Sequence, residues 1–152
     1  MIRGVLPIGP RVGSSWLMHQ LHKAGLPVYY DTGWDNILPK EGNPTGYYET
    51  IDTNLPFIHN KICKVWPRNQ ELTIDIERLV VLKRPYLEQV ESIKTQSIRE
   101  AYLFSDGPPD PRRLITNAKK AFANYYKSIP HLVVYTPDLT NRLPEIIEYM
   151  RY

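Results

Sequence analysis

Residues 6–17 read Leu-Pro-Ile-Gly-Pro-Arg-Val-Gly-Ser-Ser-Trp-Leu and join an apolar N-terminal run to a predicted helix through a small, basic turn. The unpaired N–H groups at a helix N-terminus carry the positive end of the helix dipole, so a phosphate or sulfate group can bind there. Gly13 lets the backbone approach such an anion, and Ser14 and Ser15 add hydroxyl donors. Arg11 adds a fixed positive charge. The turn is therefore predicted to bind an anion, although an ordinary strand-turn-helix with a serine N-cap fits the same residues.

A second segment follows the same plan. Residues 79–82 (Leu-Val-Val-Leu) form a short, apolar, β-branched run that is typical of a buried strand in a parallel sheet. The run ends in Lys83-Arg84-Pro85, and proline suits the first turn of a helix. Arg84 is therefore expected at the carboxyl end of a strand, with Ser92 about two turns along the next helix.

The whole chain predicts an α/β fold in three layers. Its 152 residues, 42% of them hydrophobic, suit one domain that covers residues 1–152. Strand-like runs alternate with helical segments, which indicates a parallel sheet covered by helices. The strands are predicted at 2–8, 27–30, 62–66, 79–82 and 132–135. The helices are predicted at 14–24, 47–60, 86–98, 111–127 and 144–151, with Asp110 as the cap of the fourth. Ligands of such sheets bind at the carboxyl ends of the strands.

The two segments resemble the nucleotide-binding motifs of sulfotransferases. The 5′-phosphosulfate loop of that family reads roughly Pro-Lys/Arg-Ser-Gly-Thr-Thr/Ser-Trp, and the matching residues are Pro10, Arg11, Gly13, Ser14, Ser15 and Trp16. Val12 replaces the usual serine. In the family's 3′-phosphate motif an arginine closes a strand and a serine follows eight residues later, as Arg84 and Ser92 do. Pro85 follows Arg84 without the usual intervening acid. The resemblance implies a P-loop NTPase-like parallel sheet of about five strands.

Two further segments carry weaker resemblances. Residues 43–49 (Asn-Pro-Thr-Gly-Tyr-Tyr-Glu) look like the Asn-Pro-Lys/Asp-Gly-Tyr/Phe-x-Glu segment of one sulfotransferase-related group. The same residues also fit a Pro-Gly turn that leads into a helix, with Glu49 in its first turn favoured by the dipole alone. Residues 133–139 resemble the late sulfotransferase strand that ends in Tyr-Glu-Asp-Leu.

The resemblance implies transfer of a sulfuryl group from 3′-phosphoadenosine 5′-phosphosulfate to a hydroxyl or amine of a small-molecule or glycan acceptor, with no metal. The residues expected to bind the donor are Arg11, Val12, Gly13, Ser14, Ser15, Trp16, Arg84 and Ser92. The residues expected to act in catalysis are Arg11, Glu49 and Lys64.

Lysine and base assignments leave alternatives open. Lys64 resembles the family lysine near the leaving group, although Lys61 is equally near in sequence. Trp66 stands where cytosolic members have the histidine base, so Glu49 is the favoured base. The less favoured bases are Asp31, Asp35 and His59, whereas His19 and His22 are expected to be surface or packing residues. Trp34, Tyr47 and Tyr48 are candidates for an acceptor pocket, although packing in the core or at its rim is the commoner role of such residues.

Composition bounds the class of partner. The net charge of +3 is modest and no Lys/Arg block occurs, which argues against nucleic acid and suits small anionic ligands. Cys63 is the single cysteine, so neither a disulfide framework nor a cysteine metal cluster is expected, and a reducing, cytoplasmic location is favoured. No stretch of about twenty apolar residues predicts a membrane span. The sequence leaves assembly into a homo-oligomer open.

Two other functions fit the same fold. A P-loop kinase-like phosphotransferase would need Gly-Lys-Ser/Thr at the end of the loop and an aspartate for magnesium, and the sequence offers neither clearly. A catalytically silent nucleotide-binding or structural protein is favoured by the shortness of the chain and by Trp66.

Overall fold

The computed structural model describes residues 1–31, 46, 48–50, 56–99 and 110–152. Four parallel strands form one sheet in the order β2-β1-β3-β4, and they are β1 (Ile2–Pro7), β2 (Ile62–Lys64), β3 (Ile76–Lys83) and β4 (His131–Tyr135). The α-helices are α1 (Ser14–Lys23), α3 (Tyr86–Arg99), α4 (Pro111–Ala121) and α5 (Leu143–Met150). Shorter helical turns are η1 (Pro56–Ile58), η3 (Phe122–Tyr126) and η4 (Thr136–Asp138). The predicted α/β class with a parallel sheet is confirmed.

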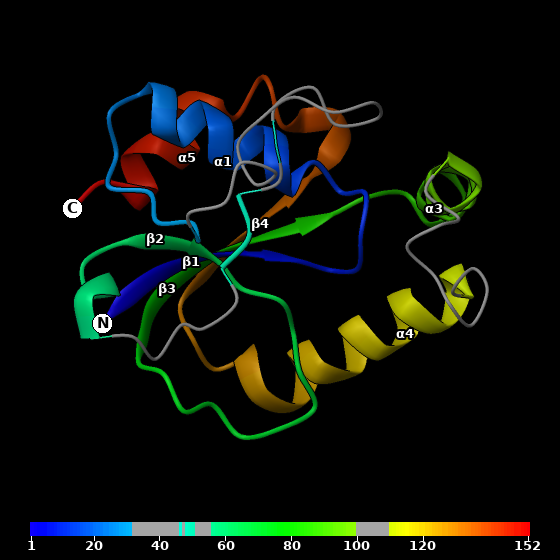
Figure 1. Cartoon of the computed structure of the whole chain (residues 1–152), viewed down its shortest axis with the longest axis horizontal. Coiled ribbons are helices and arrows are strands. Elements are labelled where there is room, and N and C mark those ends of the chain that lie inside the picture. The colour runs from blue at the N-terminus through cyan, green and yellow to red at the C-terminus, as the bar shows by residue number, and fades with distance from the viewer. Residues whose placement is uncertain (32–45, 47, 51–55, 100–109) are drawn as a thin grey trace.

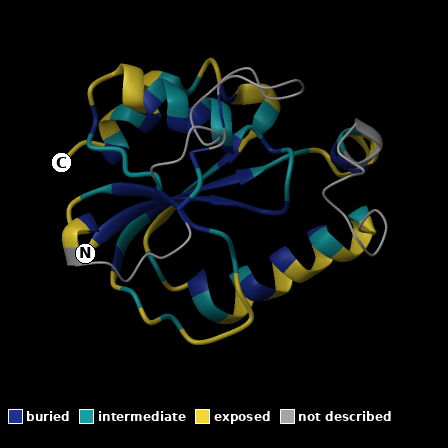
Figure 2. Cartoon of the chain, viewed as in Figure 1, coloured by how far each residue is buried: buried dark blue, intermediate teal, exposed yellow. Residues whose placement is uncertain are grey.

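Helices cover both faces of the sheet, with α1 and α5 on one face and α4 on the other (Figure 1). Alternate residues of β1 serve the two faces, because Val5 packs with Leu17 of α1 and Ile146 of α5, whereas Leu6 packs with Ala118 of α4. All six residues of β1 are buried, as expected for a central parallel strand (Figure 2).

The strand order creates a switch point beside β1. The chain leaves β1 through α1 to reach β2 on one side, and it later enters β3 on the other side of β1. α3 and α4 follow β3 and pack together through Val90, Ile93 and Ile115. Chains that leave neighbouring strands toward opposite faces leave room at the carboxyl ends, and ligands of open α/β sheets bind there. The turns after β1 and β3 are the two turns that carry the motifs.

The predicted strand at 27–30 forms only a single bridge, in which Val28 pairs with Ile62 of β2. The flanking hydrogen bonds run from the Ile62 amide to the Pro27 carbonyl and from the Tyr29 amide to the Ile62 carbonyl. The pairing ends because the next amide to bond, that of Asp31, donates to the Glu49 carbonyl instead. The described sheet therefore has four strands and one bridge, rather than five full strands.

The predicted helix at 47–60 is wrong for the residues that the structure describes. Tyr48, Glu49 and Thr50 are not helical, and the single turn of η1 is the helical part of that range. The φ of Tyr48 is +55°, which a right-handed helix does not permit. Residues 47 and 51–55 lie outside the described residues.

The other predicted helices are confirmed within a few residues. Asp110 caps α4 as expected, because its carboxylate accepts a hydrogen bond from the Arg112 amide at 3.1 Å. The predicted helix at 111–127 is continuous but changes character, since α4 ends at Ala121 and η3 continues it as a π-helix. No described helix has both the length and the apolar character that crossing a membrane requires.

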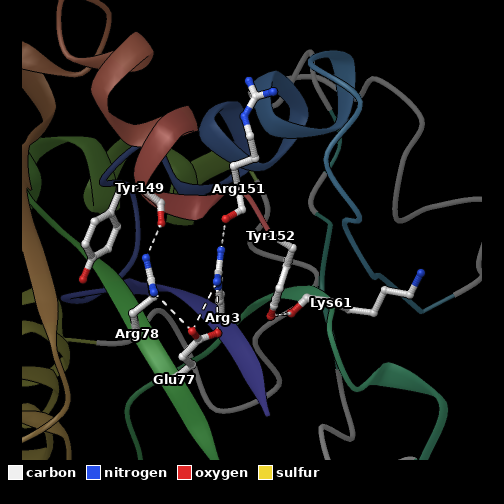
Figure 3. A network of polar contacts seen from close by, with 7 residues as sticks. All are labelled: Arg3, Lys61, Glu77, Arg78, Tyr149, Arg151 and Tyr152. Atoms are coloured by element: carbon white, nitrogen blue, oxygen red, sulfur yellow. Dashed lines mark hydrogen bonds and ion pairs between the residues drawn. The ribbon is translucent and has the colours of Figure 1, made fainter.

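Arginines near the start of β1 and β3 bind the C-terminal segment (Figure 3). Arg3 is 7% exposed, and its Nε donates to Glu77 Oε2 at 2.9 Å. The same guanidinium donates to the Arg151 carbonyl and lies 3.8 Å from the centre of the Tyr152 ring. Arg78 also donates to the Glu77 carboxylate, at 3.1 Å. Arg3 therefore joins β1, β3 and the chain after α5.

Replacing Arg3 with methionine is expected to destabilise the fold. The change keeps an apolar stem but removes the charged donors to Glu77 and Arg151, and charged hydrogen bonds contribute about 1.5–3 kcal/mol each. Urea unfolding should show a loss of that order. Arg78→Met serves as the control, since the Arg78 side chain is 33% exposed and should cost less. Equal losses for the two variants would contradict the central place of Arg3.

Candidate functional site

Residues 8–13 connect β1 to α1 through a turn with an unusual backbone. Three of its residues have left-handed conformations, with φ of +80° at Gly9, +64° at Arg11 and +86° at Gly13. Glycine adopts this region freely, whereas an arginine there is disfavoured and marks a backbone that its surroundings fix. Gly13 is the N-cap of α1 and no side chain caps it, so the serine N-cap that the sequence also allowed is not formed.

Gln89 of α3 binds the first half of the turn, and this residue is only 2% exposed. Its Nε2 donates to the carbonyls of Ile8 and Pro10, at 2.9 Å in each case. A Cβ atom at Gly9 would lie 2.8 Å from the same nitrogen. Glycine at this position therefore leaves room for the amide that shapes the turn.

The second half is bound by the ends of β3 and β4. Arg84, which follows β3, donates from Nη1 to the Arg11 carbonyl at 3.0 Å. The hydroxyl of Thr136, which follows β4, lies 2.7 Å from the Val12 carbonyl and 3.0 Å from the Lys83 carbonyl, so its one hydrogen is shared between them. The Arg11 and Val12 carbonyls therefore already accept hydrogen bonds from within the protein.

The structure brings the two predicted motifs together. Arg11 donates from Nε to the hydroxyl of Ser92 at 3.2 Å, across 81 residues of sequence. Arg84 contacts the backbone of the same Arg11, as described above. The Nε of Arg84 is buried without a hydrogen-bond partner, and its nearest carboxylate oxygen, on Glu88, is 3.8 Å away. Two guanidinium groups and one hydroxyl therefore lie at the switch point.

A buried lysine forms the second part of the site. Lys64 ends β2, and its side chain is 1% exposed. Its Nζ donates to Ser15 Oγ at 3.1 Å and to Glu49 Oε1 at 3.0 Å. Trp66 donates from its indole nitrogen to the other oxygen, Glu49 Oε2, at 2.6 Å. The Lys64 ammonium group thus connects the base of α1 to Glu49.

Burial lowers the pKa of the Lys64 ammonium group, because desolvation penalises its charge, and the Glu49 carboxylate acts in the opposite direction. The charged partner beside Lys64 is what makes an ammonium group tolerable at this depth. The charge of Lys64 therefore depends on the Glu49 carboxylate.

The positions of the side chains bear on two open choices, the lysine near the leaving group and the general base. Lys61 precedes β2, at the opposite edge of the sheet from the site, so Lys64 is the lysine at the carboxyl end. Glu49 is not in a helix, which removes the role of a carboxylate favoured only by a helix dipole. Asp31 contacts the Glu49 backbone, whereas the His59 imidazole lies 3.1 Å from the amino group of Met1.

The aromatic candidates for an acceptor pocket fare differently. Tyr48 is 2% exposed and belongs to the core, so of its two predicted roles it has the packing role rather than a place in a pocket wall. Trp34, Tyr47 and the alternative base Asp35 lie outside the described residues. Trp16 packs against the core beneath α1.

Sequence reasoning missed Gln89 and Thr136, both of which shape the turn. Gln89 lies three residues before Ser92 and so on the same face of α3, which is the signal that was available. Thr136 follows directly after β4, at the same edge of the sheet as Arg84. His19 and His22 also have an unforeseen contact, since both imidazoles meet the hydroxyl of Tyr48.

Within the described ranges, no group of three or more His, Cys, Asp or Glu side chains is placed to hold a metal ion. Burial raises the pKa of the Cys63 thiol to about 12, so this cysteine is a core residue rather than a nucleophile. Comparisons with protein-family models, curated proteins and solved structures found no match.

Replacing Gln89 with leucine is expected to lower the free energy of unfolding by about 2–4 kcal/mol, because the buried Ile8 carbonyl and the half-buried Pro10 carbonyl would lose their donor. Gln89→Glu tests the same point differently, since a carboxylate cannot donate to both carbonyls. Thermal or urea unfolding measures both effects, with the exposed Gln70 changed to leucine as the control. A Gln89→Leu protein as stable as the Gln70→Leu protein would contradict this account of the turn.

Proposed function

We propose that the chain is a sulfotransferase-like enzyme with a P-loop-like nucleotide site. It would bind 3′-phosphoadenosine 5′-phosphosulfate and transfer the sulfuryl group to a hydroxyl or amine of a small-molecule or glycan acceptor. The observation that carries the proposal is the meeting of Arg11 with Ser92 and Arg84, at 3.2 and 3.0 Å. These residues come from two motifs that the sequence places at the carboxyl ends of two predicted parallel strands.

The two parts of the site suit the two ends of the donor. The amides at the start of α1, with Ser14, Ser15 and Arg11, would bind the 5′-phosphosulfate. Arg84 and Ser92 would bind the 3′-phosphate. The left-handed backbone of Arg11 supports a ligand site at this turn, because strained residues that the surrounding structure fixes are common in ligand-binding turns.

Glu49 and Lys64 would act at the reacting end. In the proposed reaction the acceptor oxygen or nitrogen attacks sulfur, and the bond from sulfur to the bridging oxygen of the 5′-phosphate breaks. Glu49 would take the acceptor proton, and Lys64, 3.1 Å from Ser15, would stabilise the charge that develops on the leaving phosphate. The products are the sulfated acceptor and adenosine 3′,5′-bisphosphate.

A second function is favoured by one observation. Both carboxylate oxygens of Glu49 already accept hydrogen bonds, from Lys64 and from Trp66. A purely structural role for Glu49, as the charged partner of the buried Lys64, would use these same two bonds. If that is its whole role, the chain binds the nucleotide without transferring a sulfuryl group.

Adenosine 3′,5′-bisphosphate is expected to bind about tenfold or more tightly than adenosine 5′-monophosphate, because Arg84 and Ser92 would contact the extra phosphate through charged hydrogen bonds. Arg84→Ala should remove the preference. Thr136→Val is the matched control, since it also removes a side-chain bond to a carbonyl of the turn but leaves both phosphate motifs. Isothermal titration calorimetry measures each affinity.

The same titrations separate the proposal from a kinase-like function. Binding should persist in a chelator, because Arg11 and the α1 amides would carry the donor charge. Equal affinities for the two nucleotides would contradict the assignment of Arg84 and Ser92. Binding of ATP that requires magnesium would favour the kinase-like reading.

Glu49→Gln is expected to lower turnover by about 10²–10⁴-fold, because an amide can neither accept the proton nor support the charge of Lys64. Affinity for adenosine 3′,5′-bisphosphate should change little, since Arg11, Arg84 and Ser92 would bind it. A panel of phenols, sugars and amines, screened with labelled donor, supplies the assay. Glu145→Gln on α5 is the control, since that carboxylate pairs with Arg142 away from the site. Nucleotide binding without sulfation of any acceptor in the panel would favour the binding-only function.

A further inference from the structure

Tyr48 lies in the interior between two histidines of α1. Its hydroxyl oxygen is 2.9 Å from His19 Nδ1 and 3.1 Å from His22 Nδ1, and the residue is 2% exposed. The histidines are three residues apart and therefore share one face of the helix. Both rings also contact the Tyr48 ring, with centroids 5.9 and 5.7 Å away.

The contact of Tyr48 with two imidazoles requires a particular distribution of hydrogens. A tyrosine hydroxyl has one hydrogen, so it can donate to only one of the two imidazole nitrogens. The other Nδ1 must carry a hydrogen and donate to the Tyr48 oxygen. At least one of His19 and His22 must therefore be neutral. When both are protonated, both Nδ1 atoms are donors and the Tyr48 hydrogen has no acceptor between them.

The backbone around Tyr48 transmits this requirement to Glu49. Tyr48 has a φ of +55°, a conformation disfavoured for a tyrosine, so its side-chain contacts must hold it there. On the other side of Glu49, the Thr50 hydroxyl donates to the Tyr29 carbonyl at 3.3 Å. The Glu49 carbonyl accepts from the Asp31 amide at 2.9 Å. Glu49 therefore sits between two anchored residues.

We propose that Tyr48 is a positioning residue that sets Glu49 against Lys64 and Trp66, and that protonation of both His19 and His22 releases it. The catalytic consequence rests on the function proposed above, whereas the release itself does not. A fall in pH would then loosen Glu49, and with it the contact between Trp66 and the carboxylate.

The burial and the charges around the histidines determine whether a rise or a fall in pH breaks the contact with Tyr48. The pKa of His19 lies below its usual 6.5, first because of burial and then because of Lys23 and His22. Burial, with Tyr30 nearby, raises the pKa of Tyr48, so its hydroxyl stays a donor. Within the described residues, Lys23 on α1 and Tyr30 and Tyr48 from the facing segments are the titratable groups beside the histidines. One neutral imidazole is enough, so the arrangement is complete while His19 is neutral and is lost as the pH falls through the lowered pKa of His19.

The indole N–H of Trp66 reports the position of Glu49, because it donates to that carboxylate at 2.6 Å. In protein labelled with ¹⁵N at tryptophan, the Trp66 resonance is assigned by its loss in Trp66→Phe. We expect its proton to lie downfield at about pH 8 and to move upfield as the pH falls toward about 5, through the range in which histidines titrate.

Substitutions of the histidines test the cause. Asparagine places an amide near the position of Nδ1 and can donate or accept there without titrating. His22→Asn, at an exposed position, and His19→Asn with His22→Asn should both keep the downfield resonance and remove its pH dependence. Tyr48→Phe should lose the downfield position at all pH values. Tyr30→Phe is the matched control, because it removes a hydroxyl from the neighbouring ring and should behave as the unaltered protein does.

The outcomes separate this inference from the proposed function. A Trp66 resonance that does not move with pH, or that moves equally in His22→Asn, would overturn the inference even if adenosine 3′,5′-bisphosphate binds. An equal effect of Tyr30→Phe and Tyr48→Phe would overturn it as well, since ring packing would then explain both. A resonance that follows the histidines in a protein that binds no nucleotide would support the inference and reject the proposed function.

Discussion

The turn at residues 8–13 has no secondary structure of its own, and its carbonyl groups must find donors elsewhere. The Gln89 side chain donates to two of them, and Arg84 and Thr136 donate to one each. The Leu17 amide of α1 donates to the Gly13 carbonyl. The donors come from α1, α3 and the ends of β3 and β4. This constraint ties four elements to one turn, and it leaves the amides at the start of α1 without a side-chain cap.

The order of the strands explains why such donors are available. β3 lies directly beside β1, so the residues after both strands meet at the same edge. Leu82 pairs with Pro7, and the Ile8 amide donates to the Leu82 carbonyl, which brings the start of the turn against the end of β3. The long path from β1 to β3 through β2 therefore separates the two motifs in sequence but not in space.

Much of the fold could be predicted from the sequence because its signals are local. The apolar runs of β1, β3 and β4 and the Asp-Pro start of α4 each define an element without reference to the rest of the chain. The helix predicted at 47–60 failed because Tyr48 and Thr50 make long-range contacts with α1 and Tyr29, which local propensity does not include. Gln89 and Thr136 were missed for a related reason, since the acceptors of their hydrogen bonds are backbone groups with no sequence signature.

The two halves of the site differ in how their positive charges are supported. Arg11 and Arg84 carry guanidinium groups, which stay charged at ordinary pH. Arg11 donates to a hydroxyl, and Arg84 donates to a carbonyl and lies 3.8 Å from the exposed Glu88 carboxylate. Lys64 is buried, its pKa is lowered by that burial, and its charge depends on the Glu49 carboxylate. The guanidinium pair therefore suits an anion that must be held throughout a reaction. The lysine suits the place where charge changes, because the carboxylate that supports its charge is also the group proposed to take a proton.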